Sequence, residues 1–251
     1  KKFIDECHKR GIAVIFDVVY NHASGSCPLA KLYWGGSNTG ENNPWFNVNA
    51  KHDFNVFHDI NHESDFIRKY VKRNLVYLMD EYKIDGFRFD LTKGFTQKNT
   101  LGNTAEWGRK DESRIKILKD YADAIWEYDQ DAVVIFEHLA DNPEEKVLGE
   151  YGIQLWRNMQ STYGQTAMGW NDGGRSTDFS PLYTGTSSMP FGSLVSYMES
   201  HDEERCSYEV LQWGNADTKT NIKSRMKRLA LNAAFFFTVP GSKMIWQFGE
   251  L

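Results

Sequence analysis

The sequence has few cysteines, no long apolar run and no long basic run, and each absence excludes a class of protein. Cys7, Cys27 and Cys206 form an odd, sparse set with no CxxC spacing, which excludes a disulfide framework and gives no sign of a zinc site. No apolar run approaches the length that crosses a membrane. Because the net charge is −5, we expect no nucleic-acid-binding surface.

The composition is that of a large globular domain. The chain has 251 residues, of which 41% are apolar and 25% charged, enough for a sizeable core. Aromatic residues are abundant, and a core position explains any one ring about as well as a binding role does. Four tryptophans nevertheless lie in polar loops, where an aromatic face can stack on a sugar: Trp34, Trp45, Trp107 and Trp170.

Acidic residues follow several predicted strands at the point where each strand ends. The apolar run at 84–90 ends in Arg88 and Asp90, which are two residues apart and therefore share one side of an extended strand. Two further runs end at Asp17 and Glu137, and Asp202 follows another. Parallel α/β folds place their chemistry at the carboxyl ends of strands, so these positions are candidates for an active site.

The chain divides into three parts by its pattern. Residues 1–19 predict a helix that Gly11 ends, then a parallel strand at 12–19 that is buried on both faces. Residues 20–62 are rich in Gly, Asn, Pro and His, and predict an inserted subdomain because the segment is too long for a simple connection. Strands and helices alternate again over 63–251.

Within 63–251 the pattern first predicts a helix, a strand ending at Asp90 and a polar loop at 91–110; the apolar positions of the helix are Phe66, Ile67, Tyr70, Val71, Leu78 and Met79. It then predicts a helix with Leu118, Tyr121, Ala122 and Ile125, a strand at 132–137, and a weaker strand–helix pair at 152–168. After a Gly/Ser/Thr-rich loop to about 190, it predicts a strand at 193–199, a helix at 221–237 with Ile222, Met226, Leu229, Ala230 and Ala233, and a strand at 243–248.

Alternating strands and helices predict an α/β fold with parallel strands and right-handed crossovers. A doubly wound sheet shows the same pattern, but four acidic strand ends favour a TIM (β/α)8-type barrel with one shared rim. Six strands are visible, with helices between them. We therefore expect a barrel that lacks its first two strands and last helix, as a piece of a longer chain.

Four segments together resemble the α-amylase superfamily, glycoside hydrolase family thirteen. Residues 17–22 match its motif Asp-x-x-x-Asn-His, and residues 86–90 match Gly-Phe-Arg-x-Asp, with Lys93 following. Glu137 stands where the family has its strand-end glutamate, and residues 199–202 end in the family's His-Asp pair. All four occur in family order. Residues 247–251 also resemble the end of the family's eighth strand.

The resemblance implies a role for each matched residue. It implies that Asp90 is the nucleophile, that Glu137 is the acid/base, and that Asp202 holds sugar hydroxyls in a retaining mechanism. Asp17 would support the site from behind. The residues that the resemblance places against substrate are His22, Arg88, Lys93 and His201.

The resemblance also implies a structural calcium ion between the inserted subdomain and the barrel. Asn21 and Asp59 would be its ligands, and an amide and a carboxylate oxygen suit such a hard cation. The alternative is that Asn21 caps a turn and Asp59 is solvated.

Three residues depart from the family pattern: Gly94 stands where a His often follows the lysine, Ser200 replaces an Asn, and His138 directly follows Glu137. The departures leave substrate preference open. The resemblance favours cleavage of internal α-1,4 bonds in starch-like α-glucans or maltooligosaccharides, and an extracellular or cell-envelope location. The alternatives are a debranching or branching enzyme that acts at α-1,6 linkages, and a non-catalytic carbohydrate-binding relative.

Overall fold

The computed structural model describes residues 1–170 and 177–249. The chain forms two compact units, Lys1–Leu155 and Trp156–Leu251. Some residues of the predicted Gly/Ser/Thr-rich loop lie outside the described residues. So do Glu250 and Leu251, the last two residues of the segment 247–251 that is expected to end the last strand. The predicted boundaries of the inserted subdomain differ from this division and stay a prediction.

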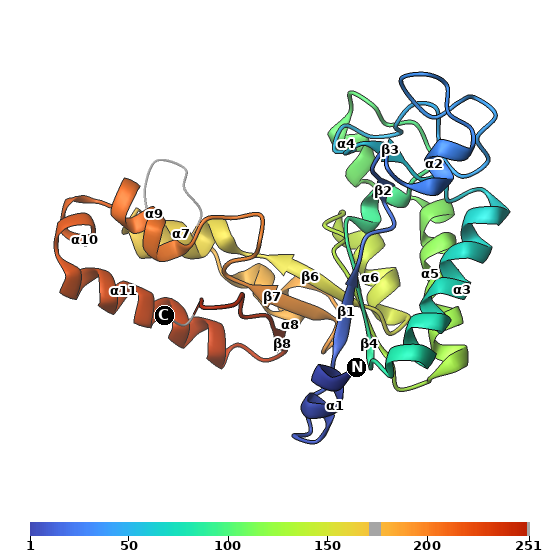
Figure 1. Cartoon of the computed structure of the whole chain (residues 1–251). Coiled ribbons are helices and arrows are strands. Elements are labelled where there is room, and N and C mark those ends of the chain that lie inside the picture. Colours follow the sequence, from blue (N-terminus) through green and yellow to red (C-terminus); the bar gives the residue numbers. More distant parts are fainter. Residues whose placement is uncertain (171–176, 250–251) are drawn as a thin grey trace. The chain divides into compact units, whose positions relative to one another are not determined.

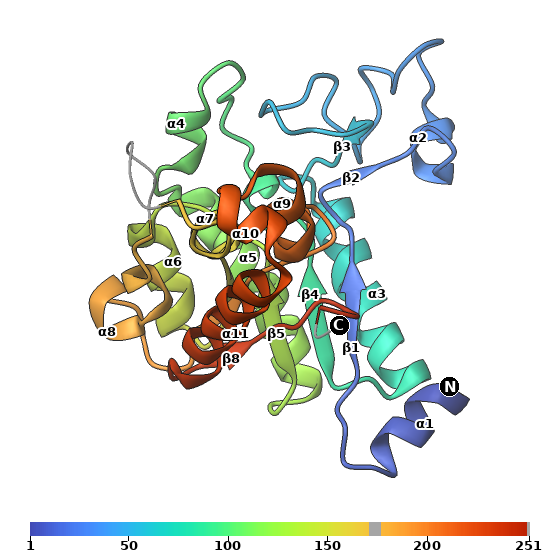
Figure 2. The same cartoon turned by 90° about the vertical axis from the view of Figure 1, so that its left-hand side faces the viewer.

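Six parallel strands form the main sheet, as the sequence predicts. The first unit contains β1 (Ile15–Val18), β4 (Gly86–Phe89), β5 (Val133–Phe136) and the start of β6 (Gln154–Asn158), and the second contains β7 (Leu194–Tyr197) and β8 (Ser242–Lys243). The strand order is β1-β4-β5-β6-β7-β8. Figure 2 shows β1 beside β4, and their register places Asp17 opposite Arg88. The strand ends that carry the predicted acids are therefore neighbours in β1, β4 and β5.

The strand β1 is more exposed than predicted. Ile15 is 37% exposed and the flanking Ile12 and Val19 are 54% and 49% exposed. The prediction of burial on both faces is wrong here because β1 is an edge strand, which pairs with β4 and with no other strand among the described residues.

Helices cover the sheet of the first unit. The chain begins with α1 (Lys2–His8), and α3 (Asp65–Tyr82) and α5 (Glu112–Tyr128) pack side by side (Figure 1). The apolar residues predicted for α5 are all buried, which confirms that helix. In α3 the buried stripe is Ile67, Val71, Leu75 and Met79. Phe66 and Tyr70 face solvent instead, because the i, i+4 stripe leaves them to one side.

The segment 20–62 has little regular structure. It contains β2 (His22–Ala23), α2 (Pro28–Leu32) and β3 (His58–Asp59), and β2 pairs antiparallel with β3 (Figure 1). His62, at the end of the segment, is fully buried, and its ring nitrogens lie 2.8 Å from the Tyr121 hydroxyl and 2.8 Å from the Tyr20 carbonyl oxygen. This histidine therefore fixes the end of the segment to α5.

The stretch 91–110 is not a plain polar loop. It contains the 3-10 helix η1 (Thr92–Phe95) and the short helix α4 (Thr104–Gly108). Trp107 is only 4% exposed, because its ring stacks on His52 at 4.8 Å and on Phe54 at 5.2 Å. Of the two explanations for this ring, the core position therefore applies to Trp107.

In the first unit, α6 (Asn142–Glu150) follows β5. The described residues of the second unit contain α7 (Gln160–Met168), η2 (Ser180–Leu182), α8 (Thr184–Ser187), α9 (Cys206–Trp213), α10 (Ala216–Thr220) and α11 (Ile222–Thr238). Its core gathers Met159, Tyr163, Leu182, Cys206 and Phe236. In α11, Ile222 and Met226 are exposed, whereas Asn232 and Phe236 are buried. None of the helices in the described residues combines the length and the hydrophobicity that crossing a bilayer requires.

A buried ion pair joins α5 to α6. Arg114 Nε and Nη2 donate to the two carboxylate oxygens of Glu144 at 2.7 and 2.8 Å, and both side chains are at most 1% exposed. Arg114 Nη1 also donates to the carbonyl oxygens of Lys93 and Trp107. A buried pair of this kind stabilises only while both partners remain, because either charge alone is left uncompensated.

His138 connects this pair to the end of β5. Its Nε2 lies 2.7 Å from Glu144 Oε1 and its Nδ1 lies 2.9 Å from Thr92 Oγ1. Thr92 in turn donates its backbone N–H to the Glu137 carbonyl oxygen at 2.9 Å, and its Oγ1 lies 3.1 Å from the same oxygen. Burial lowers the pKa of His138. A neutral His138 therefore donates from Nε2 to the carboxylate and accepts from Thr92, which fixes its tautomer.

Gly86 opens β4 where no larger residue fits. A Cβ at this position would lie 2.1 Å from the Val133 carbonyl oxygen, which is backbone and cannot rotate away. We expect Gly86→Ala to lower the unfolding free energy by about 3 kcal/mol or more through overpacking. Gly25→Ala, whose Cβ would meet only side chains at 3.4 Å or more, should be nearly neutral. Urea unfolding of both variants measures the difference, and equal stabilities would contradict the close approach.

Glu144 should make stability depend on acid pH. Burial alone would raise the pKa of Glu144, but hydrogen bonds from His138 and Arg114 outweigh it and lower that pKa to about 2. A depressed folded-state pKa contributes stability that is present above the unfolded value near 4.5 and lost as pH falls towards 2. The difference in unfolding free energy between the wild type and Glu144→Gln should therefore shrink by about 3 kcal/mol as the pH falls from about 5 to 2.

Circular dichroism during urea unfolding at a series of pH values measures this difference. The control is Glu127→Gln, because Glu127 is an exposed residue near the end of α5. A difference between wild type and Glu144→Gln that stays constant with pH would show that Glu144 is not held as a carboxylate.

Candidate active site

Arg88 bridges the acids at the ends of three adjacent strands. Its Nη1 donates to Asp17 Oδ1 at 2.7 Å and to Asp90 Oδ1 at 3.1 Å, and its Nη2 lies 2.8 Å from Glu137 Oε2. The contact with Asp90 confirms that both side chains share one face of β4. One guanidinium thus gathers three of the four predicted strand-end acids.

Arg88 and the three acids stabilise one another's charges in a site that is partly shielded from water. Burial works against the charge of Arg88, but Glu137, Asp17 and Asp90 outweigh it, so the pKa of Arg88 is raised. Arg88 therefore stays cationic and orients its partners. Three carboxylates and one guanidinium carry a net charge of −2 when all are ionised. Asp17 is 60% exposed and water screens it, which places it at the edge of the cluster.

Glu137 is the most buried acid of the cluster. Its side chain is 8% exposed, against 19% for Asp90. Besides Arg88, the backbone N–H of Leu91 donates to Glu137 Oε2 at 3.0 Å. Leu91 has a φ of 41°, in the left-handed region that a leucine avoids. Strain of this kind concentrates at functional sites, and here it points a backbone donor at a predicted acid/base.

His22 lies beside the same cluster. Burial lowers its pKa, and the Asp90 carboxylate works in the opposite direction, which places the imidazole within electrostatic reach of Asp90. Its Nδ1 lies 3.2 Å from Asn21 Nδ2. His22 is therefore a neutral ring at neutral pH with one nitrogen facing an amide.

Lys93 connects the segments that follow β4 and β5. Its Nζ donates to the Leu139 carbonyl oxygen at 2.7 Å and lies 4.2 Å from the centre of the Trp107 ring. Burial and the nearby Arg114 lower the pKa of Lys93. The ammonium thus has protein partners, which accounts for the lysine without a substrate.

The second unit carries the other two predicted site residues. Asp202 is 64% exposed and His201 37% exposed, and His201 Nε2 lies 3.5 Å from Asp202 Oδ1. The His201 ring packs against Trp156 at 6.2 Å and Trp246 at 5.8 Å. The backbone N–H of Asp202 donates to Ser200 Oγ. Packing therefore orients His201, while the Asp202 carboxylate faces solvent within this unit.

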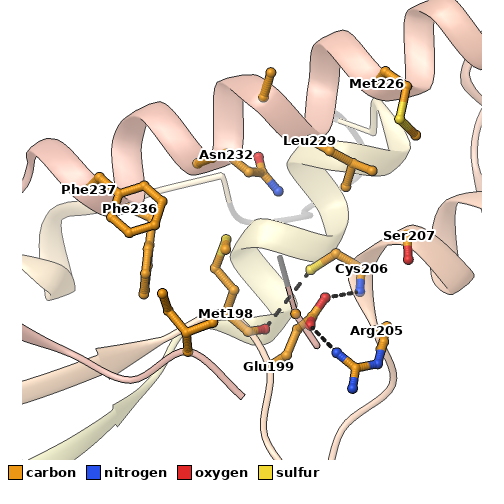
Figure 3. A pocket seen from close by; sticks show the side chains of 14 residues that line it. Met198, Glu199, Arg205, Cys206, Ser207, Met226, Leu229, Asn232, Phe236 and Phe237 are labelled. Carbon is orange, nitrogen blue, oxygen red and sulfur yellow. Dashed lines mark hydrogen bonds and ion pairs between the residues drawn. The ribbon is translucent and has the colours of Figure 1, made fainter. Parts of the chain in front are cut away.

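Two glutamates near Asp202 have structural partners. Glu203 accepts hydrogen bonds from Asn158 and Ser200, so it holds the turn rather than a substrate. Glu199 accepts from the Cys206 backbone N–H at 2.7 Å, pairs with Arg205, and lines a cavity of about 440 Å³ (Figure 3). The other walls of that cavity are mostly apolar side chains of α9 and α11, and none of the predicted site residues lines it.

The two predicted metal ligands are buried in the first unit. Asn21 is fully buried and Asp59 is 2% exposed, so the alternative of a solvated Asp59 is wrong. Neither Oδ1 atom has a hydrogen-bond partner, whereas Asn47 donates to Asp59 Oδ2 at 2.8 Å. Burial raises the pKa of Asp59 to about 7. Two unpartnered, buried oxygens of these types can bind a divalent cation.

Sequence reasoning missed Thr92, Arg114 and Glu144, which hold the backbone at Glu137. The sequence contains only an indirect signal for them: the unusual His138 after the predicted acid/base. A buried histidine needs polar partners, but periodicity cannot say which residues supply them.

Comparisons with known proteins identify the family of the chain. A model of the α-amylase catalytic domain matches residues 37–251. The chain is 31% identical over 151 residues to a malto-oligosyltrehalose trehalohydrolase of Saccharolobus solfataricus, a match that covers 58% of this chain and 23% of that protein. It is 26% identical over 269 residues to a 1,4-alpha-glucan branching enzyme of Bacillus cereus, covering 99% of this chain and 37% of that enzyme.

The fold is similar to that of an Anoxybacillus α-amylase, with a TM-score of 0.70 at 20% identity over 99% of this chain and 51% of that one. This similarity confirms the expected barrel-type α/β fold. The chain spans well under half the length of the two curated relatives. Because the family model matches most of the chain, the chain belongs to the α-amylase catalytic-domain family.

Proposed function

We propose that this chain carries the catalytic centre of a retaining glycoside hydrolase that acts on α-glucans. The observation that supports the proposal most is the single guanidinium of Arg88 in contact with both Asp90 and Glu137. Retention requires two carboxyl groups, one as nucleophile and one as proton donor, on the same reacting centre. Arg88 holds these two acids together at the ends of neighbouring strands.

In the first step, Asp90 attacks the anomeric carbon and the bond from that carbon to the leaving oxygen breaks. Glu137 gives its proton to that oxygen. In the second step, Glu137 takes a proton from water, the water oxygen bonds to the anomeric carbon, and Asp90 is released. Each step therefore conserves charge, and the cycle returns both acids to their starting states.

The different environments of the two acids support this division of roles. Burial disfavours a charge, and Glu137 is the more buried of the two. One proton added to the cluster reduces its net charge from −2 to −1, and we assign that proton to Glu137. We assign the role of nucleophile to Asp90, which keeps its contact with Arg88.

The remaining predicted contacts complete the proposal. We assign Asp202 and His201 to sugar hydroxyls, and His22 to the sugar that Asp90 attacks. Arg88 acts through the two acids. Lys93 is the least supported contact, because its ammonium already donates to Leu139. The substrate is an α-glucan polysaccharide or a maltooligosaccharide.

Within this class we propose cleavage of internal α-1,4 bonds, as in an α-amylase. Similarity to a branching enzyme over 99% of the chain favours one alternative, transfer to an α-1,6 position. Product analysis separates them. An α-amylase releases short linear oligosaccharides from amylose, a branching enzyme creates α-1,6 linkages with little new reducing sugar, and a debranching enzyme cuts pullulan.

We also propose a structural cation at Asn21 and Asp59, which the family resemblance assigns to calcium. Its charge would compensate the buried Asp59 carboxylate, and it would join β2 and β3 at the base of the 20–62 segment. The two unpartnered oxygens support this assignment.

Two variants of the full-length protein test the proposed roles. Asp90→Asn should lower the turnover of amylose by at least about a thousandfold, because an amide cannot form the glycosyl-enzyme bond. Glu137→Ala should lose activity on amylose but keep much of its first step with an activated aryl α-glycoside, whose leaving group needs no proton. Added azide should speed this variant and give the α-glycosyl azide.

The matched control is Glu203→Gln, whose side chain belongs to the turn. Starch binding without sugar release by the unmutated protein would favour the non-catalytic alternative. Aryl glycoside turnover that survives in Asp90→Asn would refute the nucleophile assignment.

Chelation tests the proposed cation. We expect dialysis against EDTA to lower the melting temperature and added Ca²⁺ to restore it, because the ion binds the folded state only. Asp59→Asn should melt at the same temperature with and without EDTA. Differential scanning fluorimetry measures both, and a wild-type protein that EDTA leaves unchanged would contradict the cation.

A further inference from the structure

Three unpartnered polar atoms lie close together in the first unit. They are Asn21 Oδ1, Asp59 Oδ1 and Nε2 of His52, a ring that is only 1% exposed and whose two nitrogens both lack a hydrogen-bond partner. His52 Nε2 lies 3.8 Å from Asp59 Oδ1. Buried polar atoms without partners are rare, and three at one place need a common explanation.

Gly94 shows that these side chains converge. A Cβ on Gly94 would lie 1.7 Å from Asn21 Oδ1 and 2.8 Å from His52 Nε2. A side chain at position 94 would therefore require Asn21 and His52 to move. The two side chains thus reach the same place from separate segments.

Neighbouring residues hold each side chain in this orientation. Asn47 donates to the other carboxylate oxygen of Asp59, and the amide nitrogen of Asn21 lies beside His22. The His52 ring stacks on Trp107 at 4.8 Å with an interplanar angle of 4°. Each contact fixes the side chain and leaves one of its polar atoms without a partner.

We propose that His52 is the third ligand of a divalent cation that Asn21 and Asp59 hold, and that this donor set prefers Co²⁺, Mn²⁺ or Zn²⁺ to Ca²⁺. The inference rests on the cation proposed above. Two bonds from one ion to a nitrogen and an oxygen span up to about 4.1 Å for zinc, and the observed 3.8 Å lies within this reach.

The chemistry of the donors favours a borderline cation. Calcium takes about six to eight oxygens, often from several carboxylates, whereas this site has one carboxylate and one amide oxygen. Imidazole nitrogen suits first-row transition cations. No group of three or more His, Cys, Asp or Glu side chains suited to a metal occurs in the described part of the chain, so the Asn21 amide is needed to complete the set.

Metal titrations of the full-length protein test the inference. After EDTA treatment and its removal, CoCl2 and CaCl2 are titrated separately by calorimetry against the wild type and His52→Phe. Phenylalanine keeps the ring that stacks on Trp107 and removes the donor. We expect wild type to bind Co²⁺ more tightly than Ca²⁺, and the variant to lose at least about tenfold in Co²⁺ affinity with a much smaller change for Ca²⁺.

A partly exposed histidine provides the control for adventitious binding. His8 lies in α1 with its ring near Asp85, and His8→Phe should leave both affinities unchanged. Should His52→Phe fail to fold, proton NMR of the wild-type Co²⁺ form replaces it. A hyperfine-shifted, exchangeable imidazole N–H signal is expected, and its absence would overturn the role of His52.

Other outcomes separate the two cation proposals. Tighter binding of Ca²⁺ than Co²⁺, with equal affinities in wild type and His52→Phe, would refute the role of His52 and leave a calcium site at Asn21 and Asp59. Failure of the wild type to bind either ion would refute both. The glycosidase proposal is judged separately, on Asp90 and Glu137.

Discussion

The contact between Arg88 and three carboxylates is the constraint on which the candidate site depends. Parallel pairing of β1, β4 and β5 places Asp17, Asp90 and Glu137 at one edge of the sheet, where their charges would repel. The guanidinium lies between them and offers donors on two nitrogens. A lysine could not replace it, because a single ammonium lacks the planar fork that reaches several acids at fixed angles. The arginine thus stabilises the strand ends and fixes the geometry of the two acids proposed to react.

A second buried arginine has a similar role behind the strand ends. Arg114 holds Glu144, which holds His138, which contacts Thr92 and through it the carbonyl of Glu137. Glu137 is therefore positioned from both sides, by Arg88 at its side chain and by this chain of contacts at its backbone. Because every member is buried, removing one leaves another without a partner, and the arrangement should be lost as a unit.

The sequence predicted what depends on local pattern. The acidic strand ends and the buried face of α5 followed from apolar runs and spacing, and the structure confirms them. Pairings between distant segments could not be predicted. Arg114 and Glu144 are thirty residues apart, and His52 meets Asn21 from within a segment that has no periodicity. Spacing reports which residues are buried but not which partners they find, and it cannot tell that β1 is an edge strand.

Asn21 links the proposed cation site to His22, a proposed sugar contact. Its amide has two ends: Oδ1 has no hydrogen-bond partner, and Nδ2 lies 3.2 Å from His22 Nδ1. With Oδ1 bound to a cation, the amide cannot flip, so Nδ2 must donate to Nδ1. The neutral His22 would then carry its proton on Nε2, which would donate in the proposed contact with a sugar hydroxyl. The cation would therefore act on the candidate active site through the Asn21 amide, by selecting the tautomer of His22.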